Sequence, residues 1–183
     1  MTQFEVIANA INATSVVLAA RNSIHTWWTG IIGCVLFGIL FFNAQLYADT
    51  TLQIFFIVTC VLGWLRWSRG LDGEPTPIRR SGLDLLCGMV FVCVIVTLFY
   101  GYLLHVYTDA FAPFLDSSVL AFSVLGQLLL MQRRIETWWC WIVVDLIAVP
   151  LFASRGLYLT SFLYAAFLVN ACIGLRRWKR ELL

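Results

Sequence analysis

The sequence has little charge. Only 12% of its 183 residues are Asp, Glu, Lys or Arg, whereas 61% are hydrophobic, and an ordinary globular domain has roughly 25% charged residues. With a mean hydropathy of +0.87, the chain has too few polar residues to cover the surface of so small a globule. The composition excludes a soluble enzyme and a nucleic-acid binder, and it predicts that the chain lies in a lipid bilayer.

Two features of exported proteins are also missing. The N-terminal segment lacks the basic start of a cleavable signal and has Glu5 in its place, so we expect the first apolar segment to be retained. No two cysteines form a CxxC motif, and each lies in an apolar stretch, which excludes a secreted disulfide scaffold and predicts small core residues. The cysteines are Cys34, Cys60, Cys87, Cys93, Cys140 and Cys172.

Long apolar runs take up most of the chain. A bilayer core is crossed by about 20 residues of helix, and seven runs approach that length. The extended polar connection at 68–82 is too short to fold as a domain. The sequence predicts an all-α membrane protein with helices at Phe4–Ala20, Ile24–Phe42, Thr50–Trp67, Leu83–Leu104, Leu115–Met131, Thr137–Ala153 and Leu157–Leu175.

The basic residues divide unequally between the two sets of alternating loops that seven spans create. Arg155 is alone on one side, whereas the other eleven lie on the opposite side. Because Lys and Arg near span ends prefer the cytoplasm, we expect a periplasmic N-terminus and a cytoplasmic C-terminus. The eleven are Arg21, Arg66, Arg69, Arg79, Arg80, Arg133, Arg134, Arg176, Arg177, Lys179 and Arg180.

The sequence repeats itself at an offset of 111 residues. Thr26-Trp27-Trp28 aligns with Thr137-Trp138-Trp139, Gly63 with Gly174, and Arg66-Trp67 with Arg177-Trp178. Two three-helix units point the same way through a membrane only if one further helix joins them, so the repeat is parallel, as in SWEET sugar carriers. The predicted organisation is a 3+1+3 repeat: unit 1–67, cytoplasmic linker 68–82, linker helix 83–104, unit 115–178 and basic tail 179–183.

Asp145 is the most unusual residue, because it lies halfway along the sixth predicted span. A carboxylate at mid-bilayer costs roughly 2.5–3.5 kcal/mol on insertion scales. It is either a neutralised or paired structural acid or a ligand or proton site. Trp138, Trp141 and Asp145 share one helical face, and an aromatic wall ending in a carboxylate suits a cation.

Other polar or aromatic side chains have weaker signals. Tryptophans near span ends are typical of an interfacial belt, which is our interpretation of Trp27, Trp28, Trp67 and Trp178 and in part of Trp138. Mid-span amides and hydroxyls either bond neighbouring helices or line a substrate path. The further candidate substrate-binding residues are Gln53, Tyr164, Gln127 and Asn170, of which Gln53 and Tyr164 are equivalent in the repeat.

Enzymatic motifs are missing. His25 and His105 fall at opposite membrane faces, and the chain contains no HExxH and no nucleotide-binding GxxxxGK[ST] loop. We therefore expect a protein that is not an enzyme, with no catalytic residue, metal or cofactor. A membrane-embedded enzyme acting through Asp145 is the remaining alternative from another class.

The segment from Ile135 to Asp145 resembles the WxxWxxxN signature of the PnuC family of bacterial nicotinamide riboside transporters. Phe41-Phe42 with Gln45–Ala48, Leu52–Phe56 and Gly63–Arg69 are similar to the second and third helices of that family. The resemblance implies a SWEET-like fold in the bacterial inner membrane, a homotrimer, and facilitated diffusion of a vitamin that a cytoplasmic kinase then traps.

Asp145 is where the chain departs from the family pattern, since nicotinamide riboside carriers typically have Asn there, and thiamine and riboflavin carriers form related branches. An Asn pairs with a carboxamide as donor and acceptor, while an Asp offers acceptors only. The residues therefore leave two cationic vitamins open: nicotinamide riboside, which we place first, and thiamine, whose aminopyrimidine presents donors. Proton coupling through Asp145 also stays open.

Overall fold

The computed structural model describes residues 3–43, 47–69, 77–108, 112–156 and 158–182, and all the elements in them are helices apart from one isolated β-bridge. Each predicted apolar run is a helix, with ends within a few residues of the prediction except at the last helix, which continues six residues further. The seven helices are α1 (Gln3–Ala20), α2 (His25–Asn43), α3 (Tyr47–Arg69), α4 (Leu83–Tyr107), α5 (Pro113–Met131), α6 (Thr137–Ser154) and α7 (Tyr158–Glu181).

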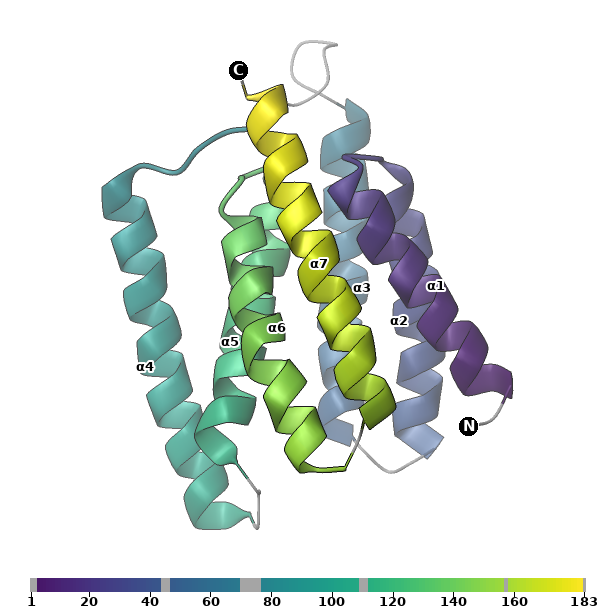
Figure 1. The fold of residues 1–183 in the computed structure, drawn as a ribbon, viewed down its shortest axis with the longest axis vertical. Coiled ribbons are helices and arrows are strands. Elements are labelled where there is room, and N and C mark those ends of the chain that lie inside the picture. Colours follow the sequence, from purple (N-terminus) through teal and green to yellow (C-terminus); the bar gives the residue numbers. More distant parts are fainter. Residues whose placement is uncertain (1–2, 44–46, 70–76, 109–111, 157, 183) are drawn as a thin grey trace.

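The helices stand side by side in one bundle, and α1 begins at the end opposite to that at which α7 finishes (Figure 1). Three of them, α4, α5 and α6, are each long and apolar enough to cross a membrane, and α1 and α2 contain shorter apolar segments. The chain is therefore an all-helical membrane protein. Many large apolar side chains face outwards from the bundle, which suits contact with lipid.

The helices α1–α3 and α5–α7 make matching contacts. The Thr26 hydroxyl donates to the Ser15 carbonyl at 2.9 Å, and the Thr137 hydroxyl donates to the Gly126 carbonyl at 2.8 Å. Residue 26 plus 111 is 137, and residue 15 plus 111 is 126, so the two bonds join positions separated by the sequence offset. In each triplet this bond fixes the start of the second helix against the first.

Two tryptophan pairs match in the same way. The Trp27 and Trp67 rings meet edge to face at 5.1 Å, and the Trp138 and Trp178 rings do so at 5.4 Å. Each pair depends on a glycine: a Cβ at Gly63 would lie 2.5 Å from the Trp27 ring, and a Cβ at Gly174 would lie 2.7 Å from the Trp138 ring. Since rings cannot yield as flexible chains do, only glycine allows this close packing.

The interfacial-belt interpretation is wrong for three tryptophans. Trp27, Trp67 and Trp178 are 1%, 4% and 0% exposed, and Trp67 and Trp178 approach each other at 6.2 Å. Together with Trp138 they form a continuous tryptophan cluster at the end of the bundle where α2 and α6 begin. Burial against facing glycines and partner indoles replaces the lipid headgroups that the prediction assumed. Trp28 is 40% exposed, as a belt residue would be.

The two triplets meet through their outer helices: α1 packs against α7, and α3 packs against α5. Among the described residues, α4 packs against α5 alone, and it stands apart from the other helices at the edge of the bundle (Figure 1). The contacts between the triplets are therefore made by α1, α3, α5 and α7.

The segment before α4 is held against the α5–α6 connection. The backbone N–H of Arg79 donates to the Arg133 carbonyl at 2.9 Å, and that of Ile135 donates to the Arg79 carbonyl at 3.0 Å. The Glu136 carboxylate accepts from the backbone N–H and the hydroxyl of Ser81 at 2.8 and 3.0 Å. These bonds tie the start of α4 to the start of α6.

Candidate functional site

A cavity of about 1500 Å³ lies between the two triplets and extends towards α4. All seven helices contribute to its lining, which is mainly apolar and aromatic. Every residue that the sequence analysis chose as a candidate for substrate binding lines this one cavity. They are Gln53, Gln127, Trp138, Trp141, Asp145, Tyr164 and Asn170.

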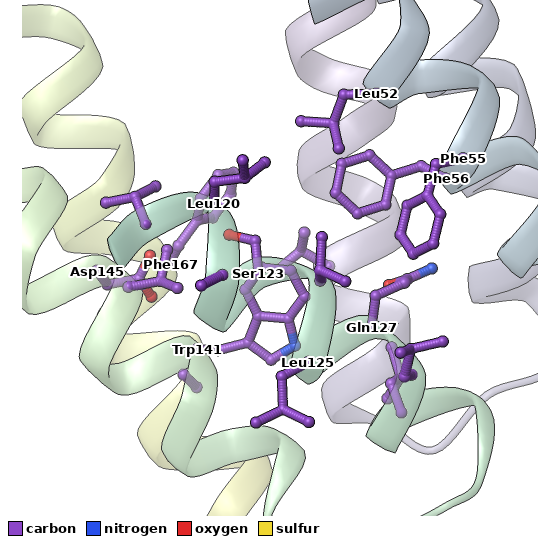
Figure 2. A pocket seen from close by; sticks show the side chains of 18 of the residues that line it. Leu52, Phe55, Phe56, Leu120, Ser123, Leu125, Gln127, Trp141, Asp145 and Phe167 are labelled. Carbon is purple, nitrogen blue, oxygen red and sulfur yellow. The ribbon is translucent and has the colours of Figure 1, made fainter. Parts of the chain in front are cut away.

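Trp141 and Asp145 lie one turn apart on α6 and face the cavity (Figure 2). The indole of Trp141 rests against α5, where a Cβ at Gly126 would lie 3.2 Å from its ring and 3.3 Å from its Nε1 atom. Phe55 and Phe56 of α3 line the cavity across from the indole (Figure 2). An aromatic ring in the cavity therefore finds aromatic faces on both sides.

The Asp145 side chain is nearly enclosed, at 3% exposure. In the part of the chain that the structure describes, no hydrogen bond or ion pair reaches its carboxylate. Tyr164 of α7 also lines the cavity, and its ring contacts Phe152 at a tilted angle and Phe167 edge to face, with centroid separations of 5.0 and 5.8 Å. A carboxylate among aromatic rings with no built-in cation is well suited to receive a positively charged ligand.

Trp138 does not share a wall with Trp141 as the helical spacing predicts. Its ring turns to α7, packs over Gly174 and against Trp178, and is 2% exposed. The two tryptophans thus lie in different contacts: Trp138 belongs to the tryptophan cluster and only bounds the cavity, whereas Trp141 faces into it. The spacing of the two tryptophans along the helix does not predict this difference. The difference is produced by the glycines that lie opposite each ring.

Two of the predicted amides bind neighbouring helices. Asn170 of α7 donates to the Val16 carbonyl of α1 at 3.0 Å. Gln127 of α5 donates to the Thr59 hydroxyl and the Cys60 sulfur of α3 at 3.4 and 3.5 Å. Each amide joins one triplet to the other, so a structural role is combined with a place in the cavity lining.

A charged pair at the other end of the bundle was missed. Arg155, after α6, donates from Nη2 to both carboxylate oxygens of Asp116 in α5 at 2.9 and 2.7 Å. Both residues line the cavity and are partly exposed. The only signal in the sequence was that Arg155 is the single basic residue on its side. The Asp116 carboxylate balances the positive charge of Arg155, which would otherwise repel a cation at this end of the cavity.

The cavity has a carboxylate and aromatic rings, which are the groups that bind an organic cation. No group of three or more His, Cys, Asp or Glu side chains comes together in the described ranges. Cys34 occupies the position that matches Asp145 in the other triplet and lines the same cavity. The two walls are therefore chemically different, with a carboxylate on α6 and a thiol on α2.

Comparison with known proteins decides the family. The family model described as nicotinamide mononucleotide transporter matches residues 2–180. The chain belongs to this family. The match covers the first six helices and all of α7 except its last residue, and so includes every residue of the cavity lining. The chain is therefore a member of a transporter family.

Individual relatives carry vitamin-transporter names. The nicotinamide riboside transporter PnuC of Escherichia coli (strain K12) is 28% identical over 205 residues, which cover 97% of this chain and 85% of that protein. The riboflavin/roseoflavin transporter RibM of Streptomyces davaonensis is 24% identical, with 95% and 83% covered. The crystal structure of the vitamin B3 transporter PnuC superimposes with a TM-score of 0.77 at 22% identity, covering 98% of this chain and 81% of that one.

Proposed function

We propose that the chain transports a cationic vitamin, nicotinamide riboside in first place, and that Asp145 and Trp141 bind its positive charge. The observation that carries this proposal is a buried carboxylate, 3% exposed, that lacks an ion-pair partner in the described ranges and lines a cavity with aromatic walls. A pyridinium ring between Trp141 and the opposite aromatic wall would supply the missing charge. The PnuC relative supports the choice of vitamin.

The proposed architecture is the 3+1+3 parallel repeat, with α4 as the linker helix and the substrate between the triplets. Matching contacts at an offset of 111 residues support it. The packing of α1 on α7 and that of α3 on α5 also support it, because the offset makes α1 equivalent to α5 and α3 equivalent to α7. The domains would then be 1–67, 68–82, 83–104, 115–178 and 179–183. The basic residues favour a cytoplasmic C-terminus and a periplasmic N-terminus in the inner membrane.

The proposed mechanism is facilitated diffusion. The two triplets rock about the bound vitamin, and a cytoplasmic kinase removes it by phosphorylation, so that uptake continues without an energy source in the transporter itself. A homotrimer is the proposed assembly. Thiamine is the second candidate substrate, because a carboxylate at position 145 accepts hydrogen bonds from an aminopyrimidine and donates none while ionised.

The test is a binding titration of the purified protein with nicotinamide riboside and with thiamine, read from tryptophan fluorescence. Trp141 in the cavity wall should report occupancy directly. We expect saturable quenching by nicotinamide riboside and weaker competition by thiamine. Tighter binding of thiamine would place thiamine before nicotinamide riboside as the substrate. If neither compound binds, the proposed function is wrong.

A further inference from the structure

A polar strip on α5 faces the cavity beside Trp141. It consists of Ser123 and Gln127, four residues apart and so one turn apart on the same face. Both lie near the Trp141 indole (Figure 2), which contacts α5 at Gly126, between them in the sequence. A ligand ring stacked on Trp141 would therefore have its edge and substituents close to this strip.

The orientation of the Gln127 amide is set by its neighbour Thr59. The Thr59 hydroxyl has one proton, which it donates to the backbone carbonyls of Phe55 and Phe56 at 3.1 and 3.0 Å. Towards Gln127 it can therefore only accept, so the amide must present its N–H there. The carbonyl oxygen then faces away from α3, on the side of Trp141 in Figure 2. The Gln127 carbonyl oxygen is therefore available in the cavity as a hydrogen-bond acceptor.

Ser123 has an unused hydroxyl. Other serines of α5 bond back to their own helix: Ser117 donates to Pro113, and Ser118 donates to Phe114, both at 2.7 Å. Within the described residues no such bond is made by Ser123, whose side chain is half-buried in the cavity wall. The hydroxyl is thus free to donate to and accept from a ligand, and the Cα atoms of Ser123 and Gln127 are about 6 Å apart along the helix axis.

We propose that Ser123 and the Gln127 carbonyl form a subsite for the hydroxyl-bearing part of the substrate, a sugar or sugar-alcohol chain. The inference rests on the proposed function and deepens it, because Trp141 and Asp145 on α6 take the charged ring while α5 takes the hydroxyls. A neutral hydroxyl and an amide oxygen bind sugar hydroxyls, which donate and accept at once. Ser123 is then a specificity residue that favours ribosylated vitamins over the bare ring.

The experiment compares two cations that differ only in the sugar. Nicotinamide riboside and N-methylnicotinamide, which is methylated at the ring nitrogen, share the pyridinium ring and the carboxamide. The second compound has a methyl group in place of ribose. Their dissociation constants are measured on the native protein and on Ser123→Ala, with Ser118→Ala as the matched control on the same helix. Ser123→Thr keeps a hydroxyl and serves as the rescue variant.

We expect Ser123→Ala to weaken nicotinamide riboside roughly three- to tenfold, as the loss of one neutral hydrogen bond does, with N-methylnicotinamide unchanged. Ser123→Thr should restore the ratio of the two constants, and Ser118→Ala should leave it as in the native protein. Equal losses for both cations, or no loss for either, would overturn the subsite. If the native protein binds neither cation, the proposed function fails, and the subsite fails with it.

Discussion

The guanidinium carbon of Arg133 lies 4.1 Å from the centroid of the Trp67 ring. Arg133 follows α5 in one triplet and Trp67 lies near the end of α3 in the other, so this contact fastens the two triplets at the tryptophan cluster. Arg133 is 8% exposed and has a positive φ of 51°, as does Asn22 (53°) at the matching position. Burial lowers the pKa of Arg133, and Glu181 acts in the opposite direction, yet the guanidinium stays charged at any physiological pH.

Arg133→Ala should therefore destabilise the protein by about 0.5–2 kcal/mol through loss of the cation–π contact. The measurement is thermal unfolding of the purified variants in one detergent. Arg80→Ala, which removes an exposed arginine from the neighbouring segment, should leave the midpoint near that of the native protein. An unchanged midpoint for Arg133→Ala would show that the stacking contributes nothing to stability.

Gly63→Ala and Gly174→Ala should each destabilise the bundle by about 1–3 kcal/mol, because the added methyl group would overlap a buried indole ring. Gly88→Ala is the control, since a Cβ there meets nothing within 4 Å and α4 gains a better helix former. Thermal midpoints decide the matter. Stable Gly63 or Gly174 variants would mean that Trp27 or Trp138 can move away without cost.

Trp141→Ala should weaken nicotinamide riboside about tenfold, because one aromatic wall of the cation site is lost. Trp28→Ala should have little effect, since that ring is exposed and its Nε1–H donates to His25 of its own helix at 2.9 Å. Isothermal titration of both variants gives the comparison. Equal losses would place the binding site away from α6.

Asp145→Asn tests whether the carboxylate binds the positive charge of the vitamin. The change keeps the shape of the side chain, removes its charge and adds an amide donor. Because both candidate vitamins are cations, the variant should lose about 1.5–3 kcal/mol of affinity for the vitamin that the native protein binds, some ten- to a hundredfold. Uptake of both radiolabelled vitamins into cells is the measurement. Unchanged or improved uptake of nicotinamide riboside by the folded variant would contradict the proposal that the Asp145 carboxylate binds the positive charge.

Topology is testable with reporter fusions. Fusions after Leu46 and after Asp109 should report the periplasm, and one after Gly73 should report the cytoplasm, because the basic residues lie on one side. Activity of alkaline phosphatase and fluorescence of green fluorescent protein are complementary readouts. A cytoplasmic signal after Asp109 would rule out a membrane-crossing linker helix.

Run lengths of apolar residues were enough to predict the seven helices, because a membrane helix satisfies its own backbone and depends little on its neighbours. The burial of Trp27 and Trp178 could not be predicted, because a tryptophan near a span end has the same sequence context in a lipid belt and in a helix contact. The informative signal was a second spacing: a glycine lies 36 residues after an indole in each triplet, Gly63 after Trp27 and Gly174 after Trp138.

The sequence predicted which residues line the candidate site but not how they are arranged within it. Polar residues at mid-span are costly, so each had to turn inwards, and all of those chosen line the cavity. Which atoms remain available to a ligand depends on contacts between distant helices. Gln127 is occupied on one side by Thr59, and Ser123 is not occupied at all among the described residues. Neither state has a sequence signature.

The sparse packing of α4 has a consequence for biosynthesis. Helices α1–α3 can complete their mutual contacts as soon as they leave the translocon, since the Trp27 ring needs only Gly63 and Trp67 from the same triplet. Helix α4 touches only α5 within the described ranges, so the first triplet makes its contacts without it. If the chain is divided between α3 and α4 and the two parts are synthesised in the same cell, we therefore expect the two polypeptides to assemble with each other in the membrane.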